Sequence, residues 1–202
     1  GITMPKIIEV AGVSFRKRIY RTIHKTFEGL VIHYTVSGRT AKSAKNVLKW
    51  LAKKGLMCIV MDEDGIFYIP KGFDIFRHYG AHAGSSAWKG DHGLNDEYAG
   101  IEICCWGRNS KKGPFRVSKG EANIIAGKYQ QYTKAQEESL INFLLYCKHM
   151  NPNFDLDKIV GHDEARDAVG KRGHKQDPGA SLSMTMPQFR KLIKKNWSKI
   201  KK

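Results

Sequence analysis

Hydrophobic runs of strand type alternate with helix-type periods along the first third of the chain. Residues 30–35 form a β-rich apolar run that ends where polar residues begin, which predicts a buried strand with His33 at its C-terminal end. Residues 40–54 repeat apolar side chains at helical spacing and precede a glycine, the residue type that commonly ends a helix. A short acidic turn ending in glycine separates the apolar runs 56–61 and 66–69, so we expect a hairpin.

The middle of the chain is less periodic. Residues 77–98 are rich in glycine, histidine, serine and asparagine and predict an ordered loop. Residues 99–106 form the next apolar run, which predicts a buried strand carrying Glu102 among apolar neighbours. Residues 107–127 are rich in lysine and glycine, and their weak periodicity predicts a surface loop.

Helix signals return in the last third. The segment 133–136, Thr-Lys-Ala-Gln, has the pattern of a capping box, and the helix behind it is expected to end at Asn151-Pro152. A short strand over 158–161 leads to His162, and the last element is a helix that opens at Pro187.

This order of elements predicts an α/β fold with a mixed central β-sheet flanked by helices. A chain of 202 residues suits a single domain with a real hydrophobic core. We expect residues 1–27 to form an N-terminal extension packed on the domain, and residues 28–202 to form the main domain, ending in a basic amphipathic helix.

Charge narrows the partners that the chain can have. Its 35 Lys and Arg against 19 Asp and Glu give a formal charge of +16, which favours a polyanionic target. Nucleic acid, anionic lipid, lipopolysaccharide and the acidic wall polymers of bacteria all qualify. Aromatic residues are not interleaved with the basic runs in a recognisable binding motif, so we expect no specific nucleic acid partner.

The sequence also bears on the cellular compartment. It has no run of eighteen apolar residues, and the short apolar stretch 7–13 is interrupted by Glu9, unlike the core of a signal peptide. We therefore expect synthesis in the cytoplasm. Cys58, Cys104 and Cys105 lie in apolar runs and are expected to be buried thiols, as in a reducing compartment. The absence of a CxxC spacing argues against a cysteine-only zinc site.

Candidate chemistry lies in three segments that are far apart in the sequence. They contain His33, His162 and Asp177, and two imidazoles with a carboxylate give zinc three protein ligands and leave the fourth position for water. Each residue alone has a simpler interpretation, as a structural histidine or as a turn aspartate before Pro178. The set is more informative, because each member stands at a predicted strand end or in a tight turn.

Five motifs follow one another in one order: Ile32-His33-Tyr34-Thr35, Ala81-His82-Ala83-Gly84-Ser85, Asn95 through Glu102, Gly161-His162-Asp163-Glu164 and Lys175-Gln176-Asp177-Pro178-Gly179. This order resembles the type 2 N-acetylmuramoyl-L-alanine amidase family, the zinc amidases related to peptidoglycan recognition proteins. The resemblance covers roughly residues 28–192 and implies the fold of that family.

The resemblance also implies roles for individual residues. One Zn²⁺ per chain would be held by His33, His162 and Asp177, Glu102 would act as general base and then acid, and Lys175 would donate to the oxyanion. Both catalytic roles are physically sensible, because a metal makes nearby water acidic and a buried cation stabilises developing negative charge.

Peptidoglycan is the substrate and partner that the resemblance implies. The candidate substrate-binding residues are Tyr34, His82, Trp88 and Asn95, the last three in the segment that lines the substrate groove of similar proteins. Trp88 could stack on a sugar or peptide face, and a half-buried loop tryptophan is the equally expected alternative.

The chain departs from the family pattern between His162 and Asp177. Asp177 follows His162 by fifteen positions, more than is usual, which indicates an enlarged loop at 165–173. If this loop displaces Asp177, then Asp163 or His174 could be the third ligand instead.

The expected function is hydrolysis of the amide bond between N-acetylmuramic acid and L-alanine, as in a phage endolysin that is made in the host cytoplasm and acts on the cell wall. The alternatives are a peptidoglycan-binding module without activity and a cytoplasmic amidase that recycles small muropeptides. We expect a monomer. The C-terminal helix would either pack on the domain with a solvated lysine face or attach to anionic lipid or lipopolysaccharide.

Overall fold

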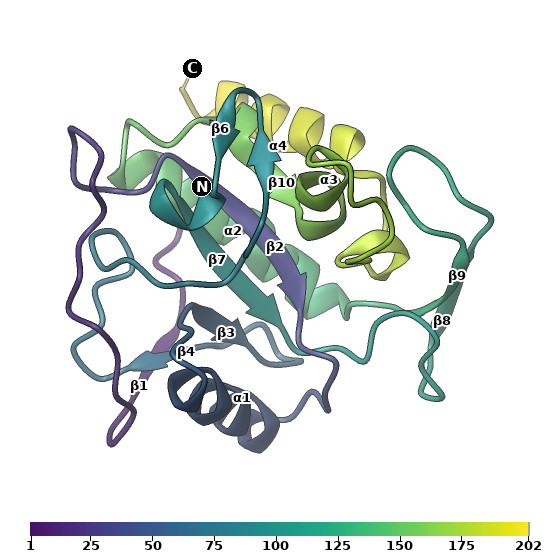
Figure 1. Cartoon of the computed structure of the whole chain (residues 1–202), viewed down its shortest axis with the longest axis horizontal. Coiled ribbons are helices and arrows are strands. Elements are labelled where there is room, and N and C mark those ends of the chain that lie inside the picture. Colours follow the sequence, from purple (N-terminus) through teal and green to yellow (C-terminus); the bar gives the residue numbers. More distant parts are fainter. Residues whose placement is uncertain (202) are drawn as a thin grey trace.

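A six-stranded mixed sheet forms the centre of the molecule in the computed structural model, which describes residues 1–201 (Figure 1). In spatial order the strands are β1 (Ile7–Val10), β4 (Phe67–Pro70), β3 (Ile59–Met61), β7 (Tyr98–Ile103), β2 (Gly29–Tyr34) and β10 (Ile159–Gly161). The strands β3, β7, β2 and β10 are parallel neighbours, whereas β3 and β4 pair antiparallel as the predicted hairpin. The predicted α/β class with a mixed central sheet is confirmed.

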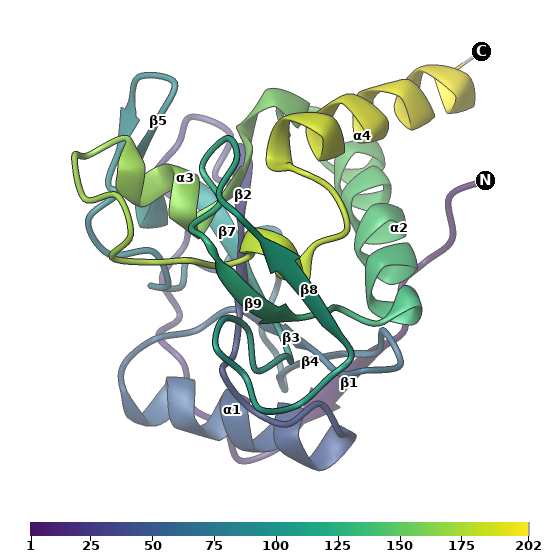
Figure 2. The same ribbon diagram turned by 90° about the vertical axis from the view of Figure 1, so that its right-hand side faces the viewer.

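Helices cover both faces of this sheet. They are α1 (Ala41–Lys53), α2 (Lys134–Met150), α3 (His162–Asp167) and α4 (Met186–Lys201), with 3₁₀ turns η1 (Leu94–Asp96), η2 (Leu156–Lys158) and η3 (Gly179–Ser181). The two views place α1 and α2 on opposite sides of the sheet, with α4 against α2 (Figures 1 and 2). The side chain of Thr40 caps α1, and Thr133 with Gln136 forms the predicted capping box of α2.

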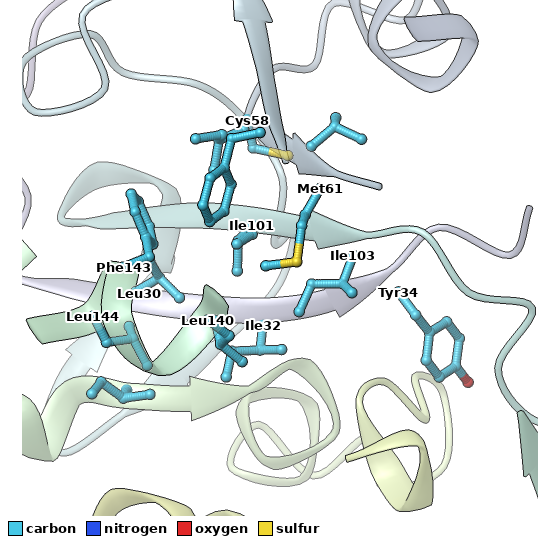
Figure 3. Packing of buried hydrophobic residues seen from close by; sticks show 14 of the residues in the cluster. Leu30, Ile32, Tyr34, Cys58, Met61, Ile101, Ile103, Leu140, Phe143 and Leu144 are labelled. Carbon is cyan, nitrogen blue, oxygen red and sulfur yellow. The ribbon is translucent and has the colours of Figure 1, made fainter. Parts of the chain in front are cut away.

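Side chains of β2 alternate between the two faces of the sheet. Leu30 and Ile32 point toward α2 and pack with its Leu140 and Phe143, as Figure 3 shows. The period of two in a strand therefore places His33 on the opposite face, the face of α1.

The same geometry places a second polar residue beside His33. Glu102 of β7 is the direct partner of His33 in the parallel register of β2 and β7. On the other side of β2, the strand β10 ends at Gly161, opposite Ile32, so that His162 follows at the same edge. The parallel neighbours β7, β2 and β10 thus bring polar side chains together near their carboxyl ends.

The segment 107–127 differs from the surface loop that we predicted. It contains β8 (Phe115–Ser118), which pairs antiparallel with β9 (Gly127–Gln130) in a separate hairpin. Each strand has only four residues, and Val117 is exposed, so the hydrophobic pattern is too short and too weak to show a strand. The hairpin is held by its own backbone pairing and by contacts with η3.

Two other segments are more structured than their sequence suggested. The loop 77–98 contains a small hairpin of β5 (Ala87–Trp88) and β6 (Asp91–His92). The segment 165–173 is not entirely loop, because α3 extends to Asp167.

The two ends of the chain take part in the fold. Residues 1–27, expected as a packed extension, supply β1, which pairs parallel with β4 at the edge of the sheet.

All four cysteines are free and buried. Within residues 1–201, none of the helices combines the length and the apolar character that crossing a bilayer requires.

Candidate metal centre

Three side chains from distant parts of the chain meet beside the carboxyl ends of β2 and β10. His33 Nδ1 lies 3.0 Å from His162 Nδ1 and 3.1 Å from Asp177 Oδ2, and the third side of the triangle, His162 Nδ1 to Asp177 Oδ2, is 3.2 Å. All three residues are buried. His33 comes from β2 and His162 opens α3, while the backbone carbonyl of Asp177 accepts a hydrogen bond from the amide of Asp163 at 2.8 Å.

Hydrogen bonds on the far side of each imidazole determine which nitrogen carries the proton. His162 Nε2 lies 3.1 Å from the carbonyl oxygen of Ala83, and a carbonyl only accepts, so Nε2 carries the hydrogen and Nδ1 of the neutral ring is bare. His82 Nε2 donates to the carbonyl of Tyr98 at 2.8 Å, which leaves His82 Nδ1 as an acceptor for His33 Nε2 at 3.0 Å. The neutral His33 ring therefore also turns a bare Nδ1 toward the cluster.

The cluster suits a tetrahedral cation. Two imidazole lone pairs and an ionised carboxylate converge without a proton among them, an arrangement that is costly to bury unless a positive ion lies between them. A tetrahedral zinc with bonds of about 2.0–2.1 Å places its ligand atoms roughly 3.3 Å apart, close to the three separations here. The donor types and the spacing both fit Zn²⁺.

Electrostatics favour the neutral form of His33 and His82 and the ionised form of Asp177. Burial and the neighbouring His162 lower the pKa of His33 to about 4. Burial and the neighbouring His33 lower the pKa of His82 to about 3. Burial acts to raise the pKa of Asp177, but His162 and His33 outweigh it and hold that pKa below its usual range. At neutral pH the rings of His33 and His82 are neutral and the Asp177 carboxylate is charged, so His33 and Asp177 are in the form that metal ligation requires.

Glu102 lies beside the cluster without joining it. Its Oε1 is 3.9 Å from His33 Nδ1, and burial together with the charge of Asp177 raises its pKa well above the ordinary value, while Lys175 acts in the opposite direction. A carboxylate whose pKa is raised in this way is suited to accept and return a proton. Lys175 is exposed but lines the same cavity as Glu102.

The two alternative third ligands lie elsewhere. Asp163 is buried, but its Oδ1 accepts the backbone N–H of Glu164 at 2.8 Å, and Asp163 is not part of the convergent cluster. His174 is exposed and likewise outside the cluster. The structure therefore brings Asp177, rather than either alternative, to the two histidines.

A cavity of about 720 Å³ opens above these residues. Its floor includes the three ligand candidates, Glu102 and Lys175, and one wall is formed by the helix α1. That wall presents Ser43, Asn46, Val47 and Trp50. We did not single out this wall from the sequence. The available signal was Trp50 on the polar face of an amphipathic helix, where it remains 54 % exposed.

The four candidate substrate-binding residues occupy different places. Tyr34 and His82 line the cavity, although His82 also holds His33. Trp88 is not among the lining residues: its Nε1 donates to the carbonyl of Asp157 at 2.9 Å, and Arg190 lies 4.8 Å from its ring centre. Asn95 is also outside the lining and bonds to the backbone of the loop that carries His82.

The comparison with protein families gives this geometry a context. Residues 24–180 match the family described as N-acetylmuramoyl-L-alanine amidase. The chain belongs to this family. The matched range contains all three ligand candidates, Glu102 and Lys175, and leaves β1 and α4 outside it. No curated protein sequence matches the chain.

Solved amidases and recognition proteins share the fold at low sequence identity. An endolysin N-acetylmuramoyl-L-alanine amidase from Clostridium intestinale is 17 % identical with a TM-score of 0.56, and the match covers 95 % of this chain and 97 % of that one. The amidase AmiD of E. coli, solved with anhydro-N-acetylmuramic acid-L-Ala-D-γ-Glu-L-Lys, is 20 % identical with a TM-score of 0.52, covering 92 % of this chain and 60 % of that one. The Apis mellifera PGRP-SA is 15 % identical with a TM-score of 0.55, covering 87 % and 92 %.

Proposed function

We propose that this protein is a zinc-dependent amidase that cleaves the bond between N-acetylmuramic acid and L-alanine in peptidoglycan. The observation that carries the proposal is the convergence of His33 Nδ1, His162 Nδ1 and Asp177 Oδ2 within 3.2 Å of one another, on the floor of a cavity shared with Glu102 and Lys175. Zn²⁺, when bound there, would polarise the attacking water and the scissile carbonyl.

The chain's own residues perform the proton transfers. Glu102 accepts a proton from the attacking water, whose oxygen forms the new bond to the lactyl carbonyl carbon. The C–N bond then breaks, and Glu102 returns the proton to the amine of the leaving L-alanine peptide. Lys175 donates to the oxyanion that develops during attack. Trp50 and Val47 offer an apolar wall on which the substrate can lie.

A complete ligand set beside a carboxylate with a raised pKa favours this proposal over a recognition module without activity. We expect about one zinc per wild-type chain, and loss of both zinc and hydrolysis in His33→Ala, because removing one of three ligands leaves an incomplete site. Metal content and muropeptide release, each measured with and without a chelator, check this. Tight binding of peptidoglycan by a zinc-free wild-type protein would show a recognition module instead.

The role within the cell depends on whether the substrate is intact cell wall or a small muropeptide. The charge of +16 supports action on the acidic wall, as an endolysin that is made in the cytoplasm and released to the wall by other means. The alternative is recycling of small muropeptides, and the ligand solved with AmiD supports that substrate class. Turnover of intact sacculi compared with turnover of an anhydro-muropeptide decides between the two: an endolysin solubilises sacculi, whereas a recycling enzyme acts on the small substrate alone.

A further inference from the structure

Two consecutive residues of one loop support both histidine ligands of the candidate metal centre. His82 Nδ1 lies 3.0 Å from His33 Nε2, and the carbonyl oxygen of Ala83 lies 3.1 Å from His162 Nε2. Each contact leaves the cluster-facing Nδ1 of its partner without a hydrogen. The protonation pattern of two ligands that lie far apart in the sequence is thus set by two adjacent residues.

A single side-chain oxygen holds this loop in place. Asn95 Oδ1 accepts the backbone N–H of His82 and that of Ala83, both at 2.8 Å. Asn95 itself is part of η1, whose Leu94 is fully buried and donates its N–H to Ser86 Oγ at 3.0 Å. The two acceptors are therefore fixed relative to each other by a short, internally bonded segment.

The sheet provides space for the His82 ring. A Cβ added at Gly100 of β7 would lie 2.5 Å from His82 Cγ and 2.7 Å from His82 Nδ1, a separation that real Cβ atoms do not reach. Only glycine at this position lets the ring lie against the strand and reach both the Tyr98 carbonyl and His33. Backbone and side-chain contacts therefore converge on one orientation of His82.

We propose that His82 and Asn95 are positioning residues that, with the Ala83 carbonyl, fix both histidine ligands in the tautomer whose bare Nδ1 faces the metal. This inference rests on the proposed function for the identity of the ion. It assigns His82 and Asn95 a task that needs no contact with the substrate. Without the acceptor at His82, the His33 ring is free to carry its hydrogen on Nδ1, which blocks ligation.

Two substitutions of His82 separate hydrogen bonding from packing. His82→Phe keeps a ring against Gly100 but removes the acceptor, whereas His82→Asn places an amide oxygen near the former Nδ1 and removes the ring. We expect His82→Phe to weaken zinc binding by about 10- to 100-fold, the range for loss of an outer hydrogen-bond partner, and His82→Asn to remain closer to wild type. Zinc affinity is measured by competition with a chromogenic chelator, and His149→Phe, an exposed histidine at the end of α2, is the matched control.

A second readout needs neither zinc nor activity. Ring-nitrogen NMR of the metal-free protein should show His33 with its hydrogen on Nε2 in wild type and in His82→Asn, and a mixture of tautomers in His82→Phe. Equal zinc affinity of wild type and His82→Phe, or an unchanged His33 tautomer in His82→Phe, overturns the proposal. So does a larger loss in His82→Asn than in His82→Phe, because packing would then be the decisive contribution.

Asn95 gives an independent test that leaves both rings intact. Asn95→Ala removes the oxygen that holds His82 and Ala83, and it should lower zinc affinity, whereas Asn95→Asp retains an acceptor and should lower it less. Wild-type affinity in Asn95→Ala contradicts the inference. A wild-type protein that binds zinc without hydrolysing peptidoglycan refutes the proposed function alone. In a wild-type protein that binds no zinc, the NMR measurement still tests the tautomers.

Discussion

Glu102 shows at the scale of one residue how stability and function oppose each other. The side chain is on a central strand, only 16 % of it is exposed, and the charge of a second carboxylate, that of Asp177, acts on it. Burial and that neighbouring charge disfavour its ionised form and raise its pKa. The same surroundings prepare it for proton transfer, so the chain retains a residue that weakens the metal-free fold.

Replacement of Glu102 by glutamine should therefore have opposite effects on activity and stability. Because its pKa is raised in the folded state, the unfolded chain releases its proton at lower pH, and stability falls as pH rises above about 4.5. Glu102→Gln cannot ionise, so the metal-free variant should melt at a higher temperature than wild type at pH 8, with the difference shrinking toward pH 4.5. Hydrolysis should fall by at least about 100-fold while zinc content stays unchanged.

Calorimetry of both proteins in chelator at pH 5 and pH 8 measures this difference. An equal difference at the two pH values would show that ionisation of Glu102 is not its cause. Loss of zinc in Glu102→Gln would assign Glu102 to the ligand set instead.

At the scale of elements, an ion pair between the partly buried Arg190 and the buried Glu164 joins α4 to the start of α3. Arg190 donates to both carboxylate oxygens of Glu164, at 2.7 and 2.8 Å, and to the carbonyl of Ile159 at 2.9 Å. Glu164 also accepts the N–H of Gly161 at 3.0 Å, directly before His162. A helix outside the family match thus supports the segment that presents a ligand candidate.

Loss of this cation should destabilise the whole fold. Arg190→Met keeps an apolar stem beside Trp88 but leaves the buried Glu164 carboxylate without a cationic partner, which costs about 3–5 kcal/mol in comparable cases. The double variant Glu164→Gln with Arg190→Met should recover part of the loss, because no charge then remains buried. Urea unfolding of the three proteins checks both expectations, and a single variant as stable as wild type would show that the pair is not important for stability.

A contact with anionic lipid is one of the two alternatives that the sequence left open for the helix α4. Its Phe189 and Ile193 are buried against the domain, so a contact in this packed state would use the lysine face rather than the apolar face. We expect deletion of residues 194–202 to weaken binding to anionic vesicles, and Lys195→Gln with Lys199→Gln and Lys201→Gln, which keeps the helix, to weaken it similarly. Unchanged vesicle binding by both variants contradicts a lipid contact through this helix.

At the scale of the whole molecule, the net charge of +16 should affect the hydrolysis of intact cell wall more than it affects the chemical step in the cavity. The screening length falls from about 10 Å at 0.1 M salt to about 3 Å at 1 M salt, so attraction between separated surface charges is lost while short contacts within the cavity persist. We expect hydrolysis of intact sacculi to fall steeply over this range and hydrolysis of a small muropeptide to change little. Rates on the two substrates at matched salt measure this, and an equal fall in both would place the salt effect at the active site.

The sequence by itself determined the class of fold and reduced the candidate centre to His33, His162 and one of three further residues. The apolar runs predicted the strands that carry His33 and Glu102, and the ordered motifs pointed to His162 and Asp177, because these signals are local and can be read along the chain. The segment between His162 and Asp177 left the third ligand open, since spacing alone cannot say which carboxylate or imidazole turns inward.

Only the tertiary structure decided how the candidate centre is supported. The acceptors at His82 and Ala83 and the Gly100 space beneath the ring depend on contacts between segments that no local pattern connects. The same reason explains the unexpected β8–β9 hairpin and the Arg190–Trp88 contact. Hydrophobic periodicity reports which face of an element is buried, whereas the partner that each polar atom finds depends on the packing of the whole chain.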